Sequence, residues 1–141
     1  MSEIDLTPFC GDAPHSPMLT RPFVRGGWKY ATDAAVVVRV PTNESDTPKA
    51  KWEPDLSPLF PDPFPACEEI LPEVPKRKGF GCVVYLVAGR EFAEFVYDRV
   101  ASLPNVRIGE WRGTYDAGSI PFVFDGGQGA MAPLSWPICR P

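Results

Sequence analysis

The second half of the chain orders its apolar and polar residues in a regular way. An apolar run over Phe80–Val87 has the length of a buried strand. In the next segment, Arg90–Leu103, apolar residues recur every three or four positions, which predicts one amphipathic helix. Its apolar face would hold Phe92, Phe95, Val96, Val100 and Leu103, and its polar face Glu91, Glu94, Asp98 and Arg99. Pro104 and Asn105 predict the helix end.

Three short strands are predicted after this helix, over Val106–Trp111, Ile120–Asp125 and Gly129–Ser135. The second of them alternates phenylalanine with valine, which is typical of a half-buried strand. The Gly-Gly-Gln tripeptide at 126–128 would form the hairpin turn between the last two strands. The predicted order of this half is therefore strand, helix, strand, strand, strand.

The first half contains a second predicted hairpin. Trp28–Ala31 and the β-branched run Ala35–Val40 flank a short turn at 32–34, and Pro41 ends the second strand. Met18–Val24 would precede it as an edge strand, because Pro22 cannot donate to a central ladder. The fold class predicted for the whole chain is α+β, with a mostly antiparallel sheet and one main amphipathic helix.

Residues 42–79 form a long proline-rich, acidic excursion. Nine of the 18 prolines lie between Pro41 and Pro75, and proline interrupts both helices and strand ladders. The excursion also carries apolar residues that a flexible linker does not need, namely Trp52, Leu56, Leu59, Phe60, Phe64, Ile70 and Leu71. We interpret it as a segment pinned to the body by aromatic anchors. Long loops are often functional, and covering one sheet edge is the alternative role.

Size and charge limit the classes of protein to which the chain can belong. Its 141 residues are 44% hydrophobic and 23% charged, as expected for a single domain over residues 1–141. No apolar run reaches the ~18 residues of a membrane span, and the acidic N-terminus has no apolar signal region, so we expect a cytoplasmic protein. The net charge of −4 gives no global attraction to nucleic acid.

No motif predicts a catalytic, cofactor or metal site. The four cysteines are scattered without a close pair and His15 is the only histidine, so zinc ligation is not favoured. Cys10 and His15 could form a nucleophile–base pair, but no third residue that would orient the imidazole is apparent. The acidic pairs, Glu68 with Glu69 and Glu91 with Glu94, are typical of solvated faces. Gly-Gly-Gln also occurs in peptide-release factors, although a hairpin turn explains it better here.

Two segments resemble one domain of the bacterial DNA polymerase sliding clamp. Tyr30-Ala31-Thr32-Asp33, followed by a β-branched run, is similar to the hairpin of that family, and the ending Gly129–Leu134 is similar to its closing strand. The chain also resembles phage-type proteins that begin with a short Cys-Gly segment and finish with a Phe-Asp-Gly-Gly segment. The resemblance implies a clamp-like domain that binds partners instead of catalysing. The domain would be a reduced form, because a clamp protomer has two or three such domains and this chain has one.

The sequence therefore predicts a non-catalytic interaction protein of phage type. Its partner would be a replication protein or a host protein, such as a defence complex whose nucleic-acid site the acidic excursion would occupy. The residues predicted to contact the partner are Trp52, Phe60, Phe64, Lys76, Arg77 and Lys78. Three alternatives remain open: a direct nucleic-acid binder using the three cations, a homodimer formed edge to edge, and a small hydrolase using Cys10 and His15.

Overall fold

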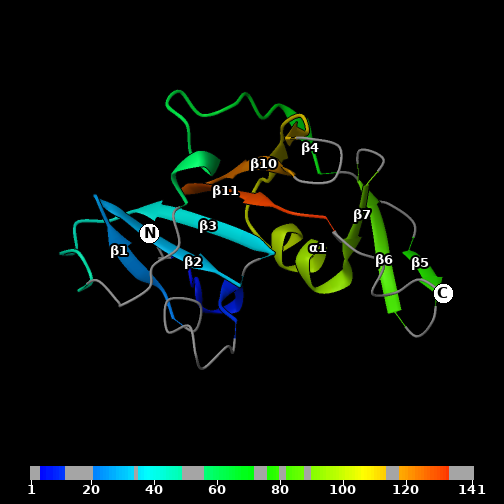
Figure 1. The fold of residues 1–141 in the computed structure, drawn as a ribbon, viewed down its shortest axis with the longest axis horizontal. Coiled ribbons are helices and arrows are strands. Elements are labelled where there is room, and N and C mark those ends of the chain that lie inside the picture. Colours follow the sequence, from blue (N-terminus) through cyan, green and yellow to red (C-terminus); the bar gives the residue numbers. More distant parts are fainter. Residues whose placement is uncertain are drawn as a thin grey trace.

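The fold is α+β, as predicted, with two antiparallel sheets and one α-helix (Figure 1). The computed structural model describes residues 4–11, 21–33, 35–48, 56–71, 76–79, 82–87, 90–113 and 118–133. The larger sheet contains β1 (Phe23–Arg25), β2 (Trp28–Thr32), β3 (Val36–Pro41), β11 (Gly127–Met131), β10 (Gly118–Phe124), β8 (Arg107–Ile108) and β4 (Glu69–Ile70), in that spatial order. Its eighth strand, β9 (Arg112–Gly113), pairs with β10.

The smaller sheet contains β5 (Lys76–Gly79), β6 (Cys82–Val87) and β7 (Arg90–Ala93). The helix α1 (Glu94–Ala101) follows β7 without an intervening loop. Two short 3-10 helices, η1 (Thr7–Phe9) and η3 (Ser57–Leu59), lie in the described part of the first half of the chain. The helix and η1 pack into the main core, so they cover one face of the larger sheet.

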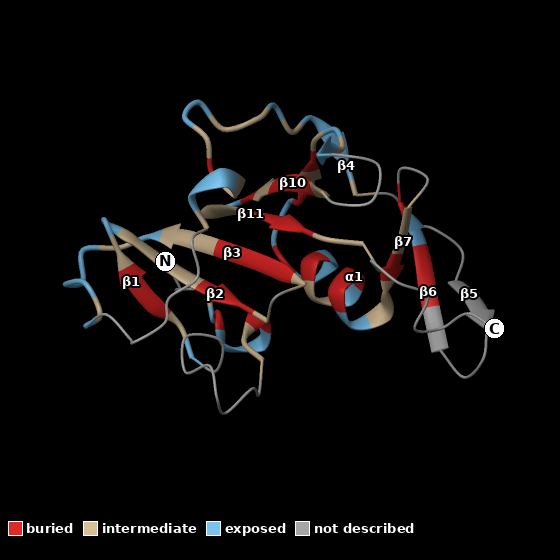
Figure 2. Ribbon diagram, viewed as in Figure 1, coloured by how far each residue is buried: buried red, intermediate tan, exposed pale blue. Residues whose placement is uncertain are grey.

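Strands from opposite halves of the chain meet at the centre of the larger sheet. β3 pairs with β11, where Val38 lies opposite Gly129 and Val37 opposite Ala130. Because side chains alternate along a strand, Val38 faces the helix while Val37 and Ala130 face the other side. The helix side holds the main core, including Ile120 and Phe122, both fully buried. Each buried side chain of that size contributes about 1.5–3 kcal/mol. Figure 2 shows buried residues along α1, β3, β10 and β11.

The predicted helix over Arg90–Leu103 is wrong in its first turn. Residues 90–93 are a strand, paired with β6, and the helix extends only from Glu94 to Ala101. Val96, Val100 and Leu103 are buried as predicted, and Phe92 is also buried, but from β7 instead of from the helix. Phe95 contradicts the prediction, because it is 49% exposed. It lies in the first helical turn on the outer face, where the Arg99 guanidinium lies 5.3 Å from its ring.

The predicted strands are confirmed with shifted bounds. β2 and β3 form the expected hairpin, and β1 starts at Phe23, with residues 18–20 of the predicted edge strand outside the described part. In the segment 106–111 only Arg107 and Ile108 form a strand, β8, and the next strand, β9, begins at Arg112. The last hairpin turns at Asp125 and Gly126, because Phe124 already pairs with Gly127. Gly126 has φ of +99°, which suits an Asp-Gly turn.

The excursion is pinned to the body, as interpreted from the sequence, and it also covers a sheet edge, while its role as a contact surface stays a prediction. Its first part covers the edge of β1: the Val24 N–H donates to Thr47 Oγ1 at 2.9 Å, and the Thr47 N–H donates to the Val24 carbonyl at 3.0 Å. Its later part lies on the sheet face opposite the helix, where Phe60, Leu56 and Leu59 form a second apolar cluster around Val37 and Ala130. The excursion therefore closes one sheet edge and covers part of one sheet face.

Candidate functional site

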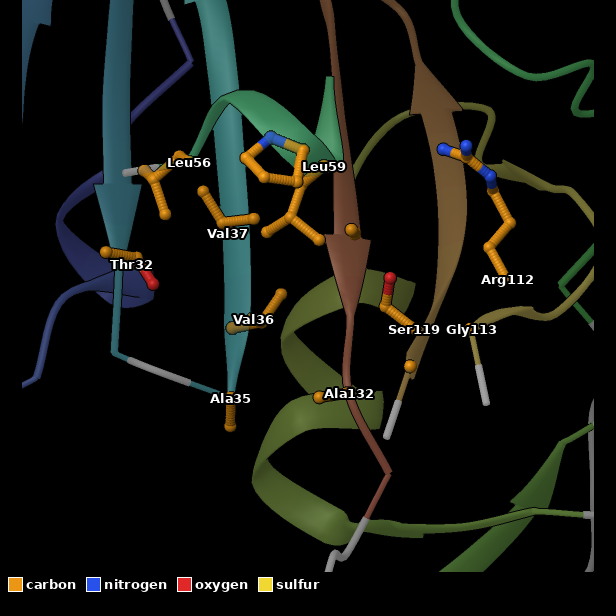
Figure 3. Close-up of a pocket in the computed structure, with 13 residues that line it drawn as sticks. Thr32, Ala35, Val36, Val37, Leu56, Leu59, Arg112, Gly113, Ser119 and Ala132 are labelled. Carbon is orange, nitrogen blue, oxygen red and sulfur yellow. The ribbon is translucent and has the colours of Figure 1, made fainter. Parts of the chain in front are cut away.

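A cavity of about 490 Å³ lies on the sheet face opposite the helix (Figure 3). Its floor is formed by Val37 of β3 and Ala130 of β11, which are cross-strand neighbours. One wall is the excursion, through Leu56, Pro58 and Leu59. The opposite wall is the β9–β10 pair, through Arg112, Gly113, Gly118 and Ser119. Figure 3 places Leu56 and Arg112 at opposite ends, with Ser119 between Leu59 and Arg112.

Small side chains create the space in this cavity. Ala130 faces it from β11, and Ala35 and Ala132 form one end, where the Ala132 N–H donates to the Ala35 carbonyl at 2.8 Å. The cavity is mostly apolar, and of the described residues that line it Arg112 alone is charged. Such a cavity, apolar with few polar groups, has the chemistry of a binding site rather than of a reaction centre.

An arginine holds the excursion wall in place. Arg39 Nε and Nη2 donate to Gln128 Oε1 at 2.8 and 2.6 Å, and Arg39 Nη1 donates to the Tyr30 hydroxyl at 3.0 Å. The guanidinium carbon lies 3.9 Å from the Trp28 ring centroid and 4.1 Å from that of Phe60. We call these five residues (Trp28, Tyr30, Arg39, Phe60 and Gln128) the Arg39 clasp. Stacking between a planar cation and two rings contributes about 0.5–2 kcal/mol per ring.

The clasp gives a structural role to Gln128, the last residue of the Gly-Gly-Gln tripeptide. Gly127 and Gln128 belong to β11, and the Gln128 amide oxygen accepts two hydrogen bonds from Arg39. This glutamine therefore has a structural partner across the sheet.

An ion pair between Asp33 and Arg99 fixes the turn between β2 and β3, next to the cavity. Asp33 Oδ1 accepts the N–H groups of Ala35 and Val36 at 2.9 and 3.0 Å. Asp33 Oδ2 accepts a hydrogen bond from Arg99 Nη1 at 3.0 Å, with the Asp33 side chain 7% exposed. The turn that positions Ala35 and Val36 at the cavity is thereby tied to α1.

Another cavity, of about 460 Å³, adjoins the first. It is lined in part by Glu68, Glu69 and Glu110, and Arg112 belongs to both cavities. The Arg90 guanidinium lies over the Trp111 ring at 4.1 Å from its centroid, on a wall of this second cavity. In the described residues, no group of three or more histidine, cysteine or acidic side chains could hold a metal ion.

Of the six predicted contact residues, the structure describes the side chains of Phe60 and Phe64. Phe60 is only 8% exposed and belongs to the clasp, so in this conformation it is an anchor that offers little surface to a partner. Phe64 is half-buried and stacks on Phe60 with ring centroids 6.0 Å apart. Lys76, Arg77 and Lys78 lie in β5, paired with β6, but their side chains are outside the description, as is the whole of Trp52. Contact roles for these four residues therefore remain predictions.

Sequence reasoning missed the cavity and the role of Arg39. One signal was present: Arg39 interrupts an otherwise apolar β-branched strand, and a charge in such a position needs a specific partner. Of its partners, Trp28 lies on the adjacent strand of the same hairpin, whereas Gln128 comes from a distant part of the sequence.

The described thiols are poor nucleophiles. Burial, with smaller contributions from Asp33 and Asp5, raises the pKa of Cys10, and burial raises the pKa of Cys67 to about 11. Since the thiolate is the reactive form, both thiols are largely unreactive at neutral pH. His15, the predicted partner of Cys10, lies outside the described residues.

No family model, curated protein or solved structure matches this chain. In the described part of the chain, no helix has the length and apolar character needed to cross a bilayer. The basis for a functional proposal is therefore the geometry and chemistry of the site itself.

Proposed function

We propose that this chain is a non-catalytic interaction module that binds a short apolar peptide segment of another protein. The observation that carries the proposal is the apolar cavity on the sheet face opposite the helix, between the excursion and the β9–β10 pair. Its volume of about 490 Å³ falls within the range of about 300–1,000 Å³ that is usual for sites that hold small ligands. Apolar anchor side chains of a peptide would fill such a space.

The walls of the cavity are held before any ligand binds. The Arg39 clasp fastens the excursion wall through Phe60, and the Asp33–Arg99 pair fixes the turn that carries Ala35 and Val36. A preformed site supports tighter binding, because fewer side chains and loops must be ordered on association.

The sliding-clamp resemblance is the basis for proposing which protein supplies the peptide. The two segments that carry the resemblance both line the cavity, through Thr32 and Ala35 on one side and Ala130 and Ala132 on the other. This arrangement supports a replication protein as the partner. A host defence protein is the alternative partner, and the nature of a captured protein distinguishes the two.

The test compares two matched variants of the protein. Ala132→Phe would fill one end of the cavity, whereas Ala101→Phe adds the same ring on an exposed site of α1. Peptides selected from a display library against the wild-type protein should lose at least tenfold in affinity for Ala132→Phe and bind Ala101→Phe unchanged. Circular dichroism and thermal unfolding would establish that both variants fold.

Two results would contradict the proposal. One is equal affinity of the selected peptides for wild type and Ala132→Phe. The other is a selection that enriches no apolar peptide. Capture from a bacterial lysate with wild type and Ala132→Phe, followed by mass spectrometry, then identifies the partner.

A further inference from the structure

The geometry points to a carboxylate on the bound peptide, next to its apolar anchor and paired with Arg112. This inference rests on the proposed function and names the chemistry of the peptide that the cavity selects. Its basis is the position of one cation at the end of a cavity whose other lining residues, in the described part of the chain, are uncharged.

Arg112 is placed where a ligand can reach it. It is exposed, it lies in the two-residue strand β9, and its cross-strand neighbour is Ser119 of β10. Cross-strand neighbours project from the same face of a sheet, and both residues line the cavity. The neighbouring pair Gly113 and Gly118 also lines the cavity and adds no side chain to it.

Arg112 differs from other described cations in its partners. Arg25, Lys29 and Arg99 each have a carboxylate oxygen within 4.0 Å of a side-chain nitrogen. Among the described residues, no carboxylate lies that close to Arg112, although Glu110 and two other glutamates line the neighbouring cavity. The planar guanidinium can therefore form a bidentate pair with an incoming carboxylate.

The contribution of this pair to binding is moderate, because Arg112 is exposed. Water and salt screen an exposed ion pair and weaken it. A charge-assisted hydrogen bond at the edge of a site is stronger than a hydrogen bond between neutral groups. We therefore expect the carboxylate to tighten binding about three- to tenfold at low salt, and the effect to shrink as ionic strength rises.

The experiment uses two peptide display libraries that differ only in their acidic residues. One contains aspartate and glutamate, and the other contains asparagine and glutamine at the same positions. Selection on the wild-type protein should favour the acidic library, with the acid next to the apolar anchor. The best peptide is then synthesised in its acid form and its amide form, and both are titrated against wild type, Arg112→Gln and Arg21→Gln. Arg21 is an exposed arginine outside the cavity and serves as the matched control.

The expected result is a preference for the acid form of about three- to tenfold in wild type and Arg21→Gln, which disappears in Arg112→Gln. Equal affinity for both forms in wild type would overturn the carboxylate inference, while a loss of binding in Ala132→Phe would still support the cavity itself. If no peptide of either library binds, the proposed function fails, and the inference fails with it. An unchanged unfolding temperature in Arg112→Gln excludes misfolding as the cause of any loss.

Discussion

Removing the Asp33 carboxylate should destabilise the protein more than removing its charge alone. In Asp33→Ala, the N–H groups of Ala35 and Val36 lose their acceptor, and Arg99 loses its partner. Each uncapped N–H group in such a turn costs about 1 kcal/mol. Arg99 is 35% exposed, so water replaces part of its lost interaction, and this loss is about 0.5–1 kcal/mol. The sum is about 3 kcal/mol.

Asp33→Asn separates the two contributions. The amide oxygen of asparagine can still accept both N–H groups, so only the ion pair with Arg99 is weakened, and we expect a loss of about 1 kcal/mol. Arg99→Met tests the same pair from the helix. In a double-mutant cycle of Asp33→Asn with Arg99→Met, the coupling energy should be about 0.5–1 kcal/mol.

The assay is equilibrium unfolding in urea, followed by far-ultraviolet circular dichroism. For a chain of 141 residues, a loss of 3 kcal/mol corresponds to a decrease in Tm of roughly 6–12 °C. If Asp33→Ala and Asp33→Asn are equally stable, the hydrogen bonds at the turn do not contribute as we reason. A coupling energy of zero would show that the ion pair does not stabilise the contact between the turn and α1.

Three further predictions concern the clasp, the sheet and a thiol. Arg39→Met should lower the free energy of unfolding by about 2 kcal/mol, and trypsin should cleave the excursion faster, because Phe60 and Gln128 lose their shared partner. Gly129→Ala should cost about 1–3 kcal/mol in urea unfolding, since a Cβ at this position would lie 2.5 Å from the Phe122 ring. The pKa of Cys67 is raised from 9.0 to about 11 in the folded state, so the unfolded protein releases its proton first, and stability should fall between about pH 9 and 11. Replacing Cys67 with alanine should reduce that slope in urea titrations at several pH values.

The local pattern of the sequence predicted the strands better than it predicted the helix. Val36–Val40 and the alternating residues around Phe122 formed strands because β-branched and aromatic residues fit a pleated, half-buried surface. Phe92 fits both a helical and a strand period. The pairing of Phe92 with Tyr85 in β6 decided between them, and this is a tertiary interaction that a helical period does not reveal.

The cavity could not be predicted from local sequence, because its parts come from four separate segments. Val37 and Ala130 become neighbours only through the pairing of β3 with β11, and Leu59 reaches them only through the anchoring of Phe60. An aromatic residue in a proline-rich segment suits both an anchor and a contact surface. The sequence identified Phe60 as important, but the position of Arg39 decided that its ring is turned inward.

The hydrogen bonds of Thr47 have a consequence for how the chain tolerates changes in length. Thr42 and Thr47 are both fastened to the first hairpin, through the Gly27 carbonyl and through Val24, so the spacing between them is fixed. Inserted residues, including an epitope or a fluorophore tag, should therefore be rejected between Thr42 and Thr47, because they would separate two points that the hairpin holds at a fixed distance.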